Sequence, residues 1–153
     1  MEFNLVVATE DDRPVLRRLV ELYRYDFSEF DQADVGPHGE YGYRYLDHYW
    51  TEAYRAPFLF RVDGCWAGFA LVRTESPFDM SEFFVMRKYR RQGVGRAAAA
   101  ELFRRFSGSW RVRQQKTNPA ATAFWRAAIP YDYDERTTDE EVIQEFDSRP
   151  VGG

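Results

Sequence analysis

One segment of the sequence concentrates positive charge and glycine immediately before an alanine run. Residues 90–96 read Arg-Arg-Gln-Gly-Val-Gly-Arg, and four alanines follow at 97–100. Glycine lets the backbone approach a ligand closely, and the first N–H groups of a helix lack internal partners and bind phosphate well. Arg90, Arg91 and Arg96 would add full charges and fork-shaped donors around those amides. The segment therefore predicts a site for a phosphate or pyrophosphate group.

The glycine spacing differs from two common phosphate-binding patterns. It does not match G-x-x-x-x-G-K-[ST], the loop that holds nucleoside triphosphates. It also departs from the dinucleotide pattern G-x-G-x-x-G, because Ala98 stands at the third glycine position. A different phosphate-containing ligand is therefore expected.

Charge is unevenly distributed along the chain. The net charge is −4, but residues 82–113 hold 2 acidic and 9 basic side chains, while residues 1–55 hold 12 acidic and 6 basic ones. A basic stretch inside an acidic protein favours a specific anion site over a general nucleic-acid surface. A solvated basic helix face is the alternative that charge alone leaves open.

Length and composition indicate a folded globular protein. The 153 residues are 44% hydrophobic and 18% aromatic, and we predict a single domain over 1–148 with a flexible tail at 149–153. No window approaches 18 apolar residues, and the N-terminus lacks the basic start of a secretory signal. We therefore expect a cytoplasmic protein without a membrane partner.

Residues that often serve as nucleophiles or metal ligands are few. Cys65 is the single cysteine, so it forms no intramolecular disulfide, and we expect it to pack in the core or in a hairpin. His38 and His48 are the only histidines and do not form a metal-ligand spacing with a carboxylate pair. No metal site is expected.

Periodicity predicts the elements that surround the basic segment. Strands are expected at 3–8, 58–62, 65–72, 80–86, 110–115, 131–135 and 141–146, and helices after 9–12, at 44–55, from 94 and from 118. Asp63-Gly64 is typical of a type I′ hairpin turn, and the polar stretch 26–42 should interrupt the first helix. This order predicts a mixed α/β (α+β) sheet.

Two segments resemble the GNAT superfamily of N-acetyltransferases, which use acetyl-CoA. The spacing Arg90-x-x-Gly93-x-Gly95 is similar to the family's coenzyme A loop, and "NPAATAFWRAAI" is similar to its second motif. The order of elements also agrees over nearly the whole chain. The resemblance implies a mostly antiparallel sheet of six to seven strands, with a central splayed parallel pair and four helices.

The resemblance also implies which residues hold acetyl-CoA. The pyrophosphate would lie on the backbone of the loop that comprises Arg90, Arg91, Gln92, Gly93, Val94, Gly95 and Arg96. The pantetheine arm would lie between the splayed strands and pair with the backbone of Phe83, Phe84 and Val85. Asn118, Ala121 and Trp125 would border it from the second motif, and Asn118 would cap its helix as well.

Direct acetyl transfer to an amine makes three chemical demands. A base must remove a proton from the amine, backbone N–H groups must stabilise the oxyanion, and a nearby acid helps the thiolate to leave. Glu82 is the expected base, acting through water, because it is the one acidic residue between Asp79 and Glu101. An ordinary charged strand residue is the alternative for Glu82.

The residue that would protonate the leaving thiolate differs from the family's pattern. Many members place a tyrosine seven residues after the asparagine, and this chain has Trp125 there. An indole N–H donates a hydrogen bond but is not a practical proton donor to a thiolate. Either bulk water protonates the thiolate, or Tyr131 or Tyr133 enters from the next segment, or the enzyme is slow.

The acceptor is expected to be a small primary amine. The residues in the first third of the chain favour a cationic amine. Aromatic residues from Tyr23 to Tyr54 cluster there with acids from Asp26 to Asp47, and such a surface favours a cation. A core role for most of the aromatics is the alternative. Many relatives dimerise, so a homodimer is compatible with the resemblance.

Two other functions remain open from the sequence. Trp125 at the usual tyrosine position motivates a non-catalytic acyl-CoA-binding module. The basic stretch motivates a binder of nucleic acid or phosphoprotein, although the acidic remainder of the chain argues against a nucleic-acid partner.

Overall fold

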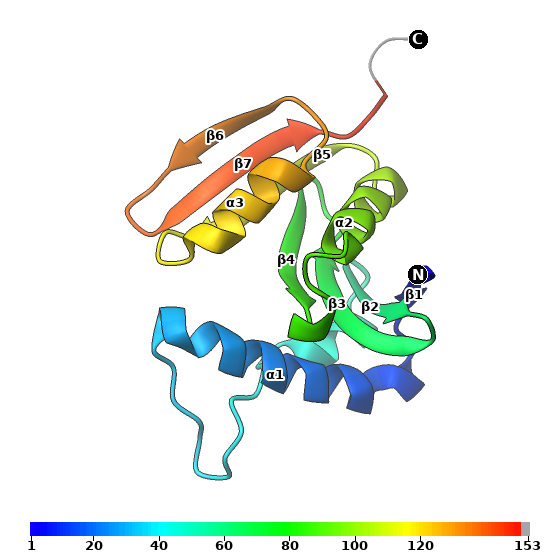
Figure 1. Ribbon diagram of the computed structural model, residues 1–153, viewed down its shortest axis with the longest axis vertical. Helices are drawn as coiled ribbons and strands as arrows, with labels where there is room; N and C mark the ends of the chain where they lie inside the picture. Colours follow the sequence, from blue (N-terminus) through cyan, green and yellow to red (C-terminus); the bar gives the residue numbers. More distant parts are fainter. Residues whose placement is uncertain (151–153) are drawn as a thin grey trace.

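A seven-stranded sheet organises the chain (Figure 1). The computed structural model describes residues 1–150. The strands are β1 (Phe3–Val7), β2 (Arg55–Val62), β3 (Cys65–Arg73), β4 (Phe78–Val85), β5 (Ser109–Gln115), β6 (Tyr133–Thr137) and β7 (Glu141–Asp147). Their order is β1-β2-β3-β4-β5-β7-β6, and β4 and β5 form the parallel pair. This mostly antiparallel sheet confirms the predicted fold class.

Three α-helices pack on the sheet, one fewer than the four helices expected. They are α1 (Arg13–Asp31), α2 (Val94–Arg105) and α3 (Pro119–Ala128), with three short 3₁₀ segments, η1 (Glu10–Asp12), η2 (Leu46–Trp50) and η3 (Arg87–Tyr89). The helix expected over 44–55 is only η2. Its two buried residues, Leu46 and Tyr49, are three positions apart, a spacing that aligns in a 3₁₀ turn, and its aromatic residues are weak α-helix formers.

Helix α1 runs further than the sequence indicates. The polar stretch from residue 26 should interrupt it, yet the helix continues to Asp31 and ends where Gln32 adopts φ 59°. The rings of Tyr23 and Phe27, and of Phe27 and Phe30, each lie 5.9 Å apart. These i,i+4 and i,i+3 contacts continue the aromatic stripe through the polar residues.

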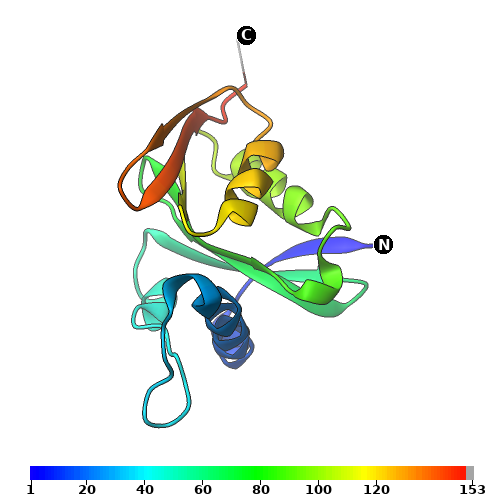
Figure 2. The same ribbon diagram turned by 60° about the vertical axis from the view of Figure 1, so that its left-hand side comes forward.

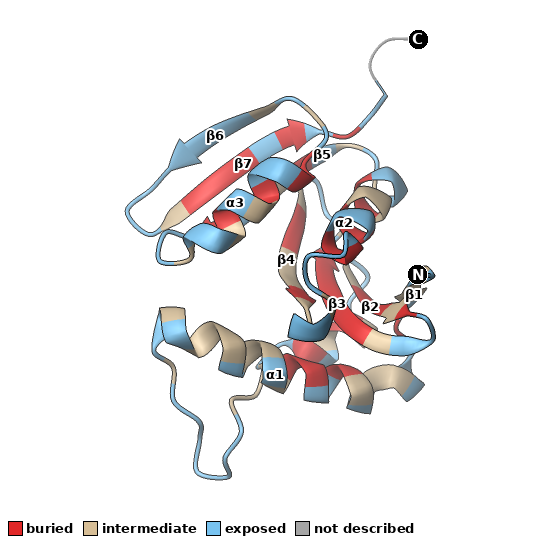
Figure 3. Cartoon of the chain, viewed as in Figure 1, coloured by how far each residue is buried: buried red, intermediate tan, exposed pale blue. Residues whose placement is uncertain are grey.

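The helices cover opposite faces of the sheet. Figure 2 shows α1 on one side and α2 and α3 on the other. Buried residues follow the same division in Figure 3: one cluster joins the sheet to α2 and α3, and a second joins it to α1 and η2. Any group that passes between β4 and β5 therefore crosses from one layer to the other.

The parallel strands separate soon after they meet. β4 and β5 pair only at Phe78 with Trp110 and at Asp79 with Arg111. Beyond that point β4 pairs only with β3, and the register there shifts between Leu71 and Val72, so that Ser81 is an extra residue in β4. Such a bulge bends a strand and re-aims its side chains. The splay predicted between these strands is thus present.

The end of the chain is described only in part. The predicted flexible tail at 149–153 falls mostly on residues 151–153, which lie outside the described residues. Arg149 is described, and its guanidinium pairs with the carboxylate of Asp147.

Candidate active site

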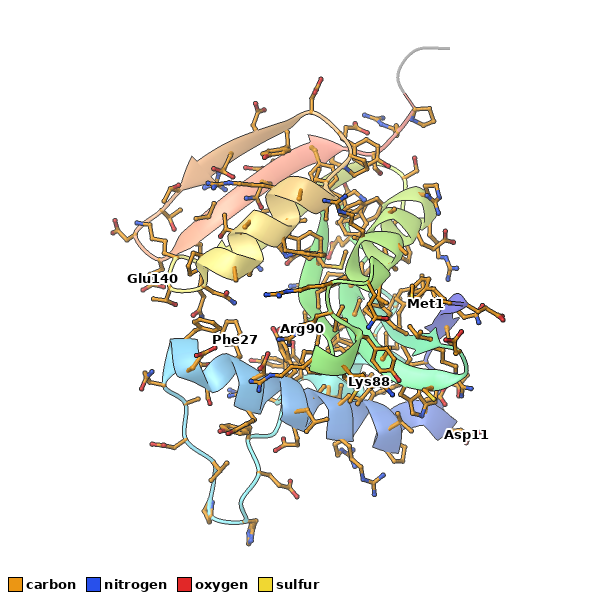
Figure 4. The ribbon with its side chains drawn as sticks, in the orientation of Figure 1. Met1, Asp11, Phe27, Lys88, Arg90 and Glu140 are labelled. Carbon is orange, nitrogen blue, oxygen red and sulfur yellow. The ribbon has the colours of Figure 1, made fainter. Side chains whose placement is uncertain are left out.

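A cleft of about 1100 Å³ opens where β4 and β5 separate. Its walls come from the second half of α1, from β4 and the loop after it, from the end of β5, and from α3. In Figure 4, Phe27 of α1 and Arg90 of the loop mark the side of the cleft nearest α1. The predicted loop, splayed strand and second motif therefore share one cavity.

The start of α2 presents free amides to this cleft. Gly93 is the N-cap residue with φ 81°, and the first intrahelical bond runs from the Ala97 N–H to the Gly93 carbonyl at 3.0 Å. The N–H groups of Val94, Gly95 and Arg96 precede that bond, so they have no partner within the helix. Such a helix start attracts an anion.

All but one of the predicted loop residues line the cleft. Gln92 does not line the cleft; it is exposed and donates from Nε2 to the Lys88 carbonyl at 2.9 Å. Within residues 1–150, Arg91 and Arg96 enter no ion pair, and both side chains are exposed at the cleft. Their charges are therefore available to a ligand.

The two glycines of the loop serve different purposes. Gly93 needs its left-handed conformation to begin the helix, and a Cβ there would meet nothing within 4 Å. Gly95 is buried, and a Cβ there would lie 2.8 Å from the ring of Phe124. Gly95 thus permits the close approach of α2 and α3, which its position in the loop does not reveal.

Arg90 is held by α1 and by the end of β4. Its Nε donates to the Val85 carbonyl at 2.8 Å, and its NH2 group donates to Asp26 at 2.7 Å. Arg87 donates to the same carboxylate at 2.6 Å. Burial opposes ionisation of Asp26, but the hydrogen bonds from Arg90 and Arg87 outweigh it and hold the pKa of Asp26 below its ordinary value.

Glu82 lines the same cleft. It lies on the face of the sheet that α1 covers, opposite the face that carries α2 and α3. Its carboxylate accepts hydrogen bonds from the hydroxyl of Tyr23, and from that of Tyr43 at 3.3 Å. Burial raises the pKa of Glu82 above its ordinary value, and the two hydrogen bonds offset only part of that rise. A half-buried carboxyl with a raised pKa can exchange protons closer to neutral pH than an exposed one.

The tyrosine pair is positioned by contacts that the sequence does not reveal. Glu21 accepts from the backbone N–H groups of Tyr41 and Gly42 at 2.8 and 2.6 Å, and Arg24 donates to the Gly42 carbonyl at 2.8 Å. These bonds hold the loop that follows α1, so that Tyr43 reaches Glu82. Tyr23 is among the aromatic residues noted at the acceptor end, but its partner cannot be read from spacing.

The backbone of β4 also faces the splay. The N–H of Met86 donates to the Ala67 carbonyl of the preceding hairpin at 2.8 Å. Residues of a strand alternate in the direction of their backbone groups, so Val85 and Phe83 point theirs away from β3, toward the side that β5 has left. The predicted residues Phe83, Phe84 and Val85 all line the cleft.

The second motif closes the cleft from α3. Asn118 caps this helix through its Oδ1, which accepts the Ala121 N–H at 3.1 Å, so its Nδ2 remains a donor. Trp125 is buried and packs edge-on against Phe83 at 4.9 Å. Asn118, Ala121 and Trp125 all line the cleft.

Neither tyrosine expected to replace the missing acid reaches the cleft. Tyr131 stacks on Phe146 with a ring separation of 5.7 Å. Among the described residues that form the cavity wall, neither Tyr131 nor Tyr133 is present. Entry of Tyr131 or Tyr133 into the site, one of the alternatives that the sequence left open, therefore has no geometric support.

Three further carboxylates line the cleft: Glu29 and Asp31 at the end of α1 and Glu141 at the start of β7. In the part of the chain that the structure describes, none of the three forms an ion pair. Arg113 lies on the same wall, but its charge is opposed by Asp79 at 2.9 Å. Of the acidic and aromatic residues that the sequence associates with the acceptor, those that line the cleft all lie on α1.

Residues 1–150 contain neither a cluster of potential metal ligands nor a helix able to cross a membrane. No three His, Cys, Asp or Glu side chains among them are arranged to hold a metal ion. None of the described helices combines the length and the apolar character that crossing a bilayer requires.

The comparisons with known proteins agree with this architecture. An acetyltransferase from Thermus thermophilus superposes with a TM-score of 0.75 at 18% identity, covering 96% of this chain and 97% of that one. The ribosomal-protein-S18-alanine N-acetyltransferase of Escherichia coli gives 0.68 at 17%, with coverages of 99% and 97%. The PaiA N-acetyltransferase of Thermoplasma acidophilum, in complex with coenzyme A, gives 0.67 at 12%, with coverages of 96% and 99%.

These superpositions show a shared fold, and a search of curated proteins found no match. The family model described as "Acetyltransferase (GNAT) family" matches residues 16–128, which include most of α1, the loop before α2 and all of α3. The matched segment is most of the 153 residues. The chain therefore belongs to the GNAT family of acetyltransferases.

Proposed function

We propose that the protein transfers the acetyl group of acetyl-CoA directly to a primary amine, without an acyl-enzyme. The observation on which this rests is that one cleft joins the free amides of α2 to the carboxylate of Glu82 through the gap between β4 and β5. Family membership supports acetyl transfer, and the coenzyme A complex of the Thermoplasma protein supports the cofactor.

The loop would hold the cofactor's pyrophosphate. The N–H groups of Val94, Gly95 and Arg96 would donate to its oxygens, and Arg91 and Arg96 would supply charge-assisted hydrogen bonds. The outward-facing backbone of Phe83 and the N–H of Val85 would pair with the pantetheine arm, while the Val85 carbonyl accepts from Arg90. Asn118 would contribute the donor that its capping bond leaves free.

Glu82 would act as the base, through water. An amine must lose its proton to attack the thioester, and a carboxylate with a raised pKa is suited to accept one near neutral pH. Tyr23 and Tyr43 fix the carboxylate's orientation. The backbone N–H groups of the splayed strand would stabilise the oxyanion, and water would protonate the leaving thiolate, since Trp125 cannot.

The acceptor would be a cationic amine. Glu29, Asp31 and Glu141 line the cleft and have no ion-pair partner among the described residues. A second positive charge on the substrate would be attracted there, whereas an acidic substrate would be repelled. A small polyamine-like or amino-sugar molecule has the required chemistry.

The test is amine-dependent release of the coenzyme A thiol from acetyl-CoA. Folded protein would be assayed with a panel of primary amines that differ in net charge, alongside Glu82→Gln. We expect release with cationic amines, little with neutral or acidic ones, and a large loss in the variant. Release by the variant at the wild-type rate would exclude Glu82 as the base.

A non-catalytic acyl-CoA-binding module is the second candidate, and the buried Trp125 favours it. Under that function acetyl-CoA would bind in the same cleft, but no amine in the panel would release the thiol. A protein that bound polyphosphates without preference for coenzyme A, and with steep salt dependence, would instead support the phosphoprotein or nucleic-acid alternative.

A further inference from the structure

One buried amide on the cleft wall has an unused hydrogen-bond acceptor. Gln114 of β5 is 5% exposed and lines the cleft. Its Oε1 has no hydrogen-bond partner among residues 1–150. A buried acceptor without a partner costs free energy, so its persistence in a ligand cleft points to a ligand donor.

The orientation of this amide is fixed by a relay that begins at the surface. Arg126 donates two hydrogen bonds to Glu135, at 2.9 and 2.7 Å. The hydrogen bonds from Arg126, and then from Gln144, lower the pKa of Glu135 to about 2, so Glu135 is an acceptor only. Gln144 must therefore turn its NH₂ group to Glu135, which it meets at 2.9 Å.

The orientation of the Gln114 amide follows from that of Gln144. With its NH₂ committed to Glu135, Gln144 presents Oε1 to its neighbour and needs a donor. Gln114 supplies that donor from Nε2 at 2.6 Å. Its Oε1 is then left over, and because Gln144 lies on β7, on one flank of β5, the oxygen is turned toward the other flank. That flank is the gap that β4 has left.

The face of the sheet decides which ligand atoms this oxygen meets. Gln114 lies on the same face of β5 as Trp110 and Val112, because residues two apart in a strand share a face, and those two pack in the cluster under α2 and α3. Glu82 lies on the opposite face, under α1, with Tyr23. A ligand anchored at the start of α2 would pass Gln114 before it reached Glu82. The donor is therefore on the cofactor's arm and not on the acceptor amine.

We propose that Gln114 Oε1 accepts a hydrogen bond from an amide N–H of the pantetheine arm of acyl-CoA. This inference rests on the proposed function. The arm carries two amides, and each brings an N–H that must be satisfied when it leaves water. Gln114 would thus be a cofactor-positioning residue, with its polarity set through Gln144 and Glu135 by Arg126.

The test compares coenzyme A with 3′-phosphoadenosine 5′-diphosphate, which keeps the nucleotide and lacks the arm. Gln114→Leu alone leaves Gln144 with an unmatched buried acceptor, so Gln114→Leu/Gln144→Leu is the main variant. We expect its dissociation constant for coenzyme A to rise about five- to tenfold, the effect of one neutral hydrogen bond. Its affinity for the nucleotide should stay within about twofold of wild type, and the KM for acetyl-CoA should rise while kcat changes little.

Three results would overturn the inference. Equal losses for the two ligands would show that the variant disturbs the whole cleft, and an unchanged affinity for coenzyme A would show that Gln114 is not a contact. A folded wild type that binds neither ligand would remove the proposed function, and the inference with it. If wild type binds both ligands, the proposed function stands, and the first two results then test the role of Gln114 alone.

Discussion

Tyr23 donates its hydroxyl hydrogen to the carboxylate of Glu82, across the interface between α1 and β4. The bond links a residue of the cleft's outer wall to the group proposed to move a proton. Its two residues are 59 positions apart along the chain, so only the packed fold brings them together. The contact bears on both the position and the protonation state of Glu82, and each can be measured.

Glu82→Gln should lower kcat/KM for acetyl transfer by about two to four orders of magnitude, the usual contribution of a general base. Glutamine keeps the shape and cannot accept the proton. The affinity for acetyl-CoA should stay close to that of wild type, because Glu82 lies on the α1 face, away from the loop. Steady-state kinetics with parallel calorimetry would separate the two effects.

The pH–rate profile should carry an acid limb governed by Glu82. The group is active when deprotonated, and burial raises its pKa, so activity should rise with pH in a range above that of an exposed glutamate. Tyr23→Phe removes a hydrogen bond that lowers this pKa. The limb should therefore move to higher pH in Tyr23→Phe, and a move to lower pH would contradict the assignment.

Glu82 should also make wild-type stability depend on pH. Its folded pKa lies above the unfolded value, so the native state holds the proton more tightly. The contribution of Glu82 to stability is complete below the unfolded pKa and is lost as pH rises through the folded pKa. The melting temperature of Glu82→Gln minus that of wild type should thus be larger at about pH 8 than at about pH 4. Thermal unfolding of both proteins at the two pH values would test this difference.

Gly95→Ala should destabilise the fold, by about 1–3 kcal/mol, because its methyl group would overlap the ring of Phe124. Gly93→Ala has space but keeps a positive φ, so its cost of about 1–2 kcal/mol would come from backbone strain alone. Gly93→Asn is the matched control, since asparagine tolerates that conformation better. Urea unfolding that ranked Gly95→Ala as the mildest of the three would contradict this assignment of packing and strain.

Several features could be predicted because they depend on local chemistry. Asp63 and Gly64 have φ of 50° and 82°, as the type I′ turn requires. Asn118 and Pro119 begin α3 as expected. The glycine at 93 marks the start of α2 for the same reason, since only a few residues adopt its conformation readily.

Other features depend on contacts between distant segments. The bond from Tyr43 to Glu82 requires a loop held by Glu21 and Arg24, and nothing in the spacing of these residues indicates it. Asp26 begins the stretch expected to interrupt a helix, but it lies within α1 and pairs with Arg87 and Arg90. The side chains that complete the site come from α1, an element whose placement the loop motif does not determine.

The most direct test of the central claim is a calorimetric titration of acetyl-CoA into wild type and into Arg91→Ala/Arg96→Ala. Both substitutions are at exposed positions outside the packed core, so the variant should fold, unlike a variant at Gly95. We predict saturable one-to-one binding by wild type and roughly tenfold or greater loss of affinity in the variant, since hydrogen bonds to charged groups contribute about 1.5–3 kcal/mol each. Folded wild type that fails to bind acetyl-CoA, or a variant that binds it equally well, would contradict the claim.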